Sequence, residues 1–120
     1  MKERMTDKIV VLVTSGSAKE ARRISRALVE RRLAACVNLF PVPVHSIYRW
    51  KGSVESAKEF LLLIKTSRKR FGAVAAEVKR LHSYDVPEII ALPIVKGSEN
   101  YLAWISESVR DGGVRKHKPR

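Results

Sequence analysis

The sequence lacks most features of secreted and membrane-spanning proteins. Cys36 is the single cysteine, so no disulfide can form within the chain, as is typical of proteins in a reducing compartment. No apolar run reaches the roughly 18 residues that a membrane-spanning helix needs. The polar segment 1–7 leads straight into an apolar run and does not resemble a signal peptide. We therefore expect a cytoplasmic protein with no membrane association.

Sequence signatures of catalysis are also missing. The chain contains no phosphate-binding glycine loop, no nucleophile elbow and no paired-histidine zinc motif. Cys36 lies in an apolar segment without a Cys–His signature, so we expect a buried structural cysteine. The sequence thus predicts a protein that is not an enzyme and requires no cofactor.

Acidic residues are scarce: 12 Asp and Glu stand against 24 Lys and Arg, which gives a net charge of +12. This excess is compatible with an anionic partner, either nucleic acid or a small anion. The simpler interpretation is a solvated surface, with part of the charge in basic ends. Segment 111–120 is one such end, and Gly112 and Gly113 predict that it is flexible. We expect any binding of nucleic acid to be non-specific.

One long hairpin over residues 33–66 dominates the chain, and Lys51, Gly52 and Ser53 form its turn. Each arm exceeds the usual strand length of about 5–6 residues, so part of the hairpin should project from its own sheet. The projecting part carries exposed apolar residues, which are an aggregation hazard unless another subunit covers them. The hairpin therefore predicts an oligomer.

The expected elements form a single domain over residues 8–110, between flexible ends at 1–7 and 111–120. Their order is strand, helix, strand, strand, helix, strand and then an extra C-terminal helix. This is the split βαβ pattern of an α+β ferredoxin-like sandwich. The strand at 8–14 and the 60–64 segment contain no proline, so we expect them at the centre of the sheet. Helices should cover one face, and the other face should need a partner.

Several segments in order together resemble the CutA family of divalent-cation tolerance proteins. They are LAACVN at 33–38, SIYRWKG at 46–52, LIKT at 63–66, HSYDVPEI at 82–89 and GSENYLAWI at 97–105. The resemblance implies a ferredoxin-like subunit in a tight homotrimer, with the hairpin crossing to neighbouring subunits. It also implies a role in tolerance to divalent metals such as copper. The family is similar in architecture to trimeric nitrogen-signalling regulators, which suggests ligand sensing.

The alternative function is a basic nucleic-acid-binding module on the same fold. RNA-recognition domains stack bases on aromatic residues of their central strands. Here those strands are aliphatic apart from Phe60, and the RNA-recognition signature is absent. We therefore prefer the function implied by the family resemblance to that of a nucleic-acid-binding module.

A metal site is predicted at His82 and Glu88, which flank a loop containing Tyr84. Imidazole and carboxylate ligands suit zinc or copper(II). Some family members carry a cysteine where this chain has Val13 and a second histidine where it has Leu81. With only two ligands, we expect at most weak binding of Cu(II) or another divalent cation. The alternative is that His82 and Glu88 make hydrogen bonds within the loop or contacts between subunits.

A further set of residues is expected in a cleft or interface between subunits. Lys65 could pair with Glu59 or Glu88, or meet a small anionic ligand. Aromatic side chains could line such a cleft or form the core of an interface. The whole set is Tyr48, Trp50, Glu59, Lys65, Tyr84, Tyr101 and Trp104.

Overall fold

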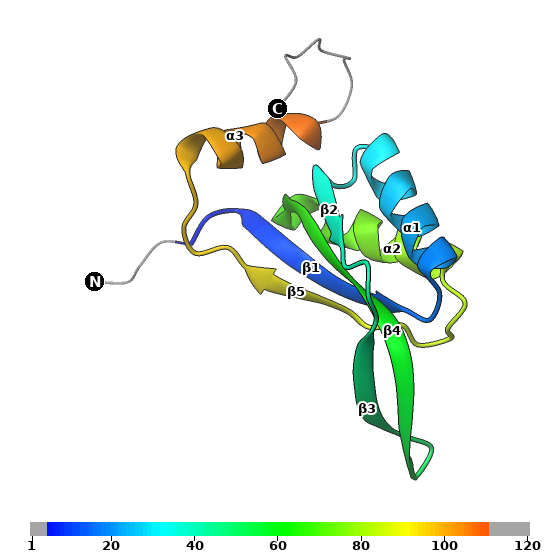
Figure 1. The fold of residues 1–120 in the computed structure, drawn as a ribbon. Coiled ribbons are helices and arrows are strands. Elements are labelled where there is room, and N and C mark those ends of the chain that lie inside the picture. The colour runs from blue at the N-terminus through cyan, green and yellow to red at the C-terminus, as the bar shows by residue number, and fades with distance from the viewer. Residues whose placement is uncertain (1–4, 111–120) are drawn as a thin grey trace.

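Five strands and three α-helices occupy residues 5–110, the part of the chain that the computed structural model describes (Figure 1). The strands are β1 (Lys8–Ser15), β2 (Cys36–Leu39), β3 (Val44–Trp50), β4 (Ser53–Ser67) and β5 (Ile89–Pro93). The helices are α1 (Ala18–Glu30), α2 (Phe71–Leu81), which follows a 3₁₀ turn at Arg68–Arg70, and α3 (Glu99–Ser108). This order confirms the α+β ferredoxin-like fold with an extra C-terminal helix.

The expected flexible ends lie mostly outside the described residues. Positions 1–4 and 111–120 are not described. The backbone N–H and the side-chain hydroxyl of Thr6 both donate to the carbonyl oxygen of Ile94. The chain is therefore anchored two residues before β1 begins.

The sheet has the strand order β2-β4-β1-β5, and every pairing is antiparallel. The two apolar, proline-free strands β1 and β4 are central, as predicted. Val11 lies opposite Ile64 and Val13 opposite Leu62, so the same face of both strands is apolar. This face packs against α1 and α2.

The core between the sheet and these helices follows from the helical spacing of apolar residues. On α1 the stripe of Ala21, Ile24 and Leu28 is fully buried, as its spacing predicts. On α2 Val74 and Val78 are fully buried. Side chains of this size contribute about 1.5–3 kcal/mol each when buried, so this layer supplies most of the domain's hydrophobic stabilisation.

The opposite face of the sheet carries apolar side chains that remain accessible within residues 5–110. Ile90 and Leu92 of β5 are half exposed, and their neighbours on β1 and β4 are half buried. The helix α3 packs near one end of the sheet, where Ile105 and Val109 cluster with Ala35. We call the accessible surface the open face; it consists of Val10, Leu12, Leu61, Leu63, Ile90 and Leu92.

The first arm of the long hairpin is two strands rather than one. It breaks over residues 40–43, so β2 pairs with the C-terminal half of β4 and β3 pairs with its N-terminal half. Pro41 and Pro43 cause the break, because proline has no backbone N–H to donate to the ladder. We call β3 with the first half of β4 the ribbon, and it projects below the sheet in Figure 1.

A tight two-residue turn closes the ribbon. Lys51 has φ of 48° and Gly52 has φ of 83°, both in the left-handed region. Positive φ at both positions is typical of the type I′ turn, whose twist matches that of the flanking strands. Ile47 on the ribbon is 76% exposed, so the projection and the exposed apolar surface expected from the sequence are both present.

Candidate functional site

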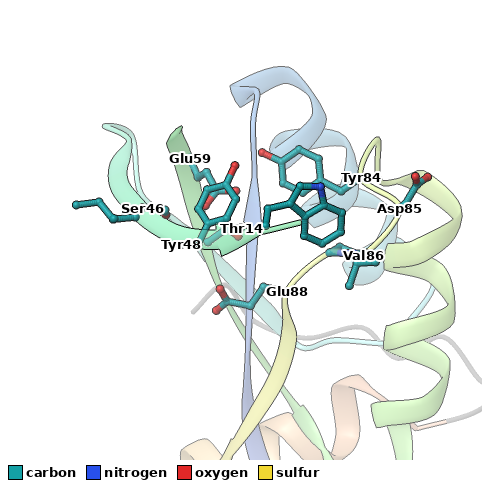
Figure 2. Close-up of a pocket in the computed structure, with 11 residues that line it drawn as sticks. Thr14, Ser46, Tyr48, Glu59, Tyr84, Asp85, Val86 and Glu88 are labelled. Atoms are coloured by element: carbon teal, nitrogen blue, oxygen red, sulfur yellow. The ribbon is translucent and has the colours of Figure 1, made fainter. Parts of the chain in front are cut away.

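A cleft of about 680 Å³ lies between the ribbon and the loop that precedes β5. Figure 2 shows Tyr48 and Glu59 from the ribbon on one side and Tyr84 and Val86 from the loop on the other. We call it the acidic cleft; its lining residues are Thr14, Ser46, Ile47, Tyr48, Trp50, Glu59, Tyr84, Asp85, Val86, Pro87 and Glu88.

The charges around the acidic cleft all have one sign. Glu59, Asp85 and Glu88 line it, and its lining contains no Lys or Arg. Glu59 is 7% exposed, whereas Asp85 and Glu88 are exposed. A cleft that gathers carboxylates attracts cations and repels anions. Its electrostatics therefore favour a cationic ligand over the small anionic ligand considered from the sequence.

Tyr84 forms part of the wall with its phenol kept protonated. Burial, together with the neighbouring carboxylate of Glu59, raises the pKa of Tyr84 to about 12. The hydroxyl group is therefore a hydrogen-bond donor throughout the neutral range. The Tyr84 ring also lies 4.8 Å from the His82 ring, centroid to centroid.

The Tyr84 hydroxyl occupies space that a side chain at position 16 would fill, so this position accommodates glycine. A Cβ atom at Gly16 would lie 2.9 Å from Tyr84 Oη, closer than real Cβ contacts. The Gly16→Ala variant should therefore displace the Tyr84 ring. Because the hydroxyl is the end of a partly exposed side chain that can move, the free energy of unfolding should fall by only about 1 kcal/mol, the low end of the cost of overpacking. Chemical denaturation measures this change.

The matched control is Gly72→Ala in α2, where no atom lies within 4 Å of the added methyl group. Because alanine favours a helix, this variant should be stabilised by about 0.5–1 kcal/mol. Equal stability of the two variants would mean that the Tyr84 hydroxyl is not confined by Gly16.

The imidazole of His82 is buried, and both of its ring nitrogens are hydrogen-bonded within the chain. Nε2 lies 2.7 Å from the carbonyl oxygen of Thr14, and because a carbonyl only accepts, Nε2 carries the proton. Nδ1 accepts from the backbone N–H of Tyr84 at 3.1 Å. The imidazole side chain is 0% exposed. A metal ion at either nitrogen would have to break one of these bonds, so the imidazole fixes the loop to β1.

Glu20 completes the attachment of the loop. Its carboxylate accepts from Ser15 Oγ at 2.7 Å and from the backbone N–H of Ser83 at 3.0 Å, and it lies 3.5 Å from His82 Nδ1. Burial raises the pKa of Glu20, but the hydrogen bonds from Ser15 and Ser83 and the nearby His82 lower it by more, so the pKa lies below its usual value.

Ser17 and Glu20 have the Ser-x-x-Glu spacing that is typical of a capping box, and the structure forms only half of that motif. Ser17 Oγ does accept from the backbone N–H of Glu20 at 3.0 Å. The Glu20 side chain turns instead toward Ser15 and Ser83, which lie in other segments. Sequence reasoning missed this contact, because a capping box and a long-range carboxylate produce the same local pattern.

The other candidate residues do not gather at the acidic cleft. Lys65 is six residues from Glu59 along β4, a span of roughly 20 Å, so the two cannot pair within one subunit. Tyr101 and Trp104 contact each other on α3, with ring centroids 5.3 Å apart. Both pack against the cluster around Ile105. Of the predicted set, Tyr48, Trp50, Glu59, Tyr84 and Glu88 share the cleft lining.

Residues 5–110 of a single chain form no metal site by themselves. Within residues 5–110, no three His, Cys, Asp or Glu side chains lie close enough together to hold an ion. Val13 is fully buried in the core and Leu81 ends α2, so neither position offers a ligand. Cys36 is a free thiol and half buried, more accessible than its apolar neighbours suggested. No helix between residues 5 and 110 is long and apolar enough to cross a membrane.

Comparison with known proteins supplies the family. Residues 9–108 match the family model described as CutA1 divalent ion tolerance protein. The Divalent-cation tolerance protein CutA of Thermus thermophilus is 52% identical over 99 residues, which cover 82% of this chain and 95% of that protein.

Two solved structures have the same fold over nearly their whole length. One, described as the periplasmic divalent cation tolerance protein CutA from Archaeoglobus fulgidus, has a TM-score of 0.83 and 43% identity and covers 86% of this chain and 99% of its own. The other, CutA1 from Oryza sativa, has a TM-score of 0.84 and 41% identity; the match covers 90% of this chain and 98% of that chain. The chain therefore belongs to the CutA1 divalent ion tolerance family.

Proposed function

We propose that this chain forms a homotrimer that binds a small cation, with divalent metal ions as the first candidates, in the acidic cleft. The observation that carries the proposal is a cleft lined by three carboxylates and no Lys or Arg. On this proposal the protein acts by binding, either in metal tolerance itself or as a sensor that signals it. We propose the cytoplasm as its compartment, since Cys36 alone can form no internal disulfide.

Assembly is supported by two surfaces that a single subunit leaves uncovered. The open face exposes half of Ile90 and Leu92. The ribbon exposes Ile47 and Val54, which are 76% and 65% accessible. Contiguous apolar surfaces of this kind mark protein–protein interfaces. The number of three subunits rests on the family resemblance.

The acidic cleft suits an ion completed by further ligands rather than a closed site. Carboxylate and hydroxyl oxygens favour hard cations such as Mg²⁺ and Mn²⁺, whereas copper and zinc prefer nitrogen and sulfur. One wall of the cleft is the ribbon, which we expect to lie against a neighbouring subunit. Ligands from that subunit or from water would complete the coordination, which predicts weak binding.

Calorimetric titration of the full chain with MnCl₂, ZnCl₂ and CuCl₂ tests this proposal. The Glu88→Gln variant should lose at least about tenfold in affinity, because one charged ligand is removed from a site with few ligands. Glu88 is exposed, so the substitution should leave the fold unchanged. Glu99→Gln, an exposed carboxylate at the start of α3 outside the cleft lining, is the matched control and should bind like the wild type.

His82→Ala separates this site from the alternative at the loop histidine. We expect it to lower stability while metal affinity of the folded fraction stays within about threefold, since both ring nitrogens are already bonded. If His82→Ala abolished binding and Glu88→Gln did not, the ion would sit on the imidazole and the acidic cleft would not be the site.

A further inference from the structure

The excess positive charge of the described chain is confined to one layer. We call residues 18–32 and 68–81 the basic layer; it comprises α1 with the two residues after it, the 3₁₀ turn and α2. This layer holds eleven Lys and Arg residues and three carboxylates. The remaining described residues hold seven of each kind. The whole net charge of residues 5–110 therefore lies on the basic layer, on the side of the sheet opposite the open face.

The basic side chains of α1 form a stripe that points away from the core. Lys19, Arg22, Arg23 and Arg26 recur at intervals of three and four residues, so they share one side of the helix. All four are exposed, and the buried stripe of α1 lies on the opposite side. The stripe is roughly 10 Å long at 1.5 Å per residue. It is accessible whether the chain is single or assembled through the open face.

The carboxylates of these described helices neutralise one cation of the stripe, Arg26, while Glu77 pairs with Arg31 and Arg80 outside it. Glu20 and Glu77 are buried, which leaves Glu30 as the one exposed acid of the basic layer. Glu30 pairs only with Arg26, at 3.3 Å. Lys19 and Arg22 make no side-chain hydrogen bond or ion pair with any other part of residues 5–110. The field of this layer is therefore strongly positive.

We propose that the basic layer binds the phosphate backbone of double-stranded nucleic acid. Four cations in roughly 10 Å approach the charge density of a duplex, which carries one negative charge per about 1.7 Å of its axis. Three of the four are arginines, whose planar guanidinium binds phosphate oxygens in pairs. Electrostatic contact of this kind reads no base sequence. This binding is independent of the acidic cleft and of its ligand.

The residues beside the cations favour a duplex over two other anionic partners, a membrane surface and single-stranded nucleic acid. A membrane-surface helix places large apolar side chains beside its cations, whereas Val29 is the one exposed large apolar residue on the described basic layer. Proteins that bind single strands stack bases on aromatic side chains. Phe71 is the aromatic residue of this layer, and it is half buried against the core. The surface thus fits a backbone and offers nothing to unpaired bases.

Fluorescence anisotropy with a short labelled DNA duplex of mixed sequence, over a series of salt concentrations, tests the proposal on the full chain. The test variant combines Lys19→Gln, Arg22→Gln and Arg26→Gln. Arg23 is retained because its guanidinium donates to the carbonyl oxygen of Leu81 at 3.1 Å and holds the end of α2. Affinity at low salt should fall at least tenfold, and the slope of log K against log salt should decrease by about 2.7, or about 0.9 per lost contact.

The matched control removes the same three charges from the ribbon by Arg49→Gln, Lys51→Asn and Lys58→Gln. Asparagine is chosen at position 51 because it tolerates the positive φ there. The control should stay within about threefold of the wild type and keep its salt slope. Both variants leave segment 111–120 unchanged, and thermal melting checks that both are folded.

Three results would overturn the proposal. Equal losses in the two variants would mean that only net charge matters. A wild-type chain that does not bind the duplex at low salt would remove the partner altogether. Co-sedimentation with phosphatidylserine vesicles, without duplex binding, would make the basic layer a membrane surface.

Discussion

The Leu92→Glu variant should be a folded monomer under conditions in which the wild type has three times the chain mass. Leu92 lies on β5 in the open face and is 52% exposed in a single subunit, so a carboxylate there is tolerated by an isolated chain. In an assembled open face the same carboxylate would be removed from water, and Lys65, the cation in line with it on this face, lies two strands or about 10 Å away beyond Val10. Burying an unpaired polar or charged group costs at least about 2 kcal/mol in each subunit, and a trimer incurs this cost three times. Multi-angle light scattering at micromolar concentration measures the mass.

The matched control is Val29→Glu, which introduces the same charge at a 42% exposed valine on the basic layer. It should keep the mass of the wild type, because this side of the molecule does not take part in the proposed assembly. A trimeric Leu92→Glu variant would show that the open face is not the interface. A monomeric wild type would remove the assembly itself.

The Glu20→Ala variant should lose about 2–3 kcal/mol of unfolding free energy, since it leaves the Ser15 hydroxyl and the Ser83 N–H without their charged acceptor. The loop that carries Tyr84, Asp85 and Glu88 should also become mobile. The rate of hydrogen exchange at the Ser83 and Tyr84 amides should then increase more, relative to the wild type, than the rate in the core strands. Glu20→Gln, which keeps one acceptor oxygen, should lose less.

The same carboxylate makes stability depend on pH. Because the folded pKa of Glu20 lies below its ordinary value of 4.5, the contribution of this carboxylate to stability is complete above pH 4.5 and is lost as pH falls through the folded pKa. Wild-type stability should therefore drop more steeply below about pH 4.5 than that of Glu20→Gln. Parallel pH profiles of the two proteins would show that the carboxylate is not bonded as described. Glu30→Gln, at an exposed carboxylate, is the control and should follow the wild type.

The fold could be predicted from the sequence because its elements are specified locally. The apolar, proline-free strands β1 and β4 had to be central, and the buried stripe of α1 could be counted from its spacing. The break at residues 40–43 was within reach as well, since Pro41 and Pro43 lie in the arm. The break was not predicted because β2 and β3 both pair with β4, so the two halves of the arm follow one continuous partner strand.

The site was less predictable because its contacts join distant parts of the chain. His82 was singled out as a metal ligand from its type and its place in a loop. In the structure the Nε2–H of His82 instead donates a hydrogen bond to the carbonyl oxygen of Thr14, 68 residues away. No local sequence pattern predicts such a contact. Lys65 was expected to meet Glu59 because it is a cation at the end of a central strand, but the extended strand β4 holds the two apart. The confinement of charge to the basic layer was in the sequence, and it became evident only once the helices were placed beside each other.

The strands that pair with β4 lie at different distances from it in the sequence, and this difference predicts an order of folding. The ribbon joins residues across a two-residue turn, starting from Trp50 opposite Ser53, whereas the central pair joins Lys8 to Ser67. Local hairpins form in about 1–10 μs, while long-range pairing must first overcome the entropy of closing a large loop. The ribbon, which exposes Ile47 and Val54, therefore forms before the core that anchors it. In that interval two nascent chains can pair through their ribbons, so the yield of refolding should fall as protein concentration rises.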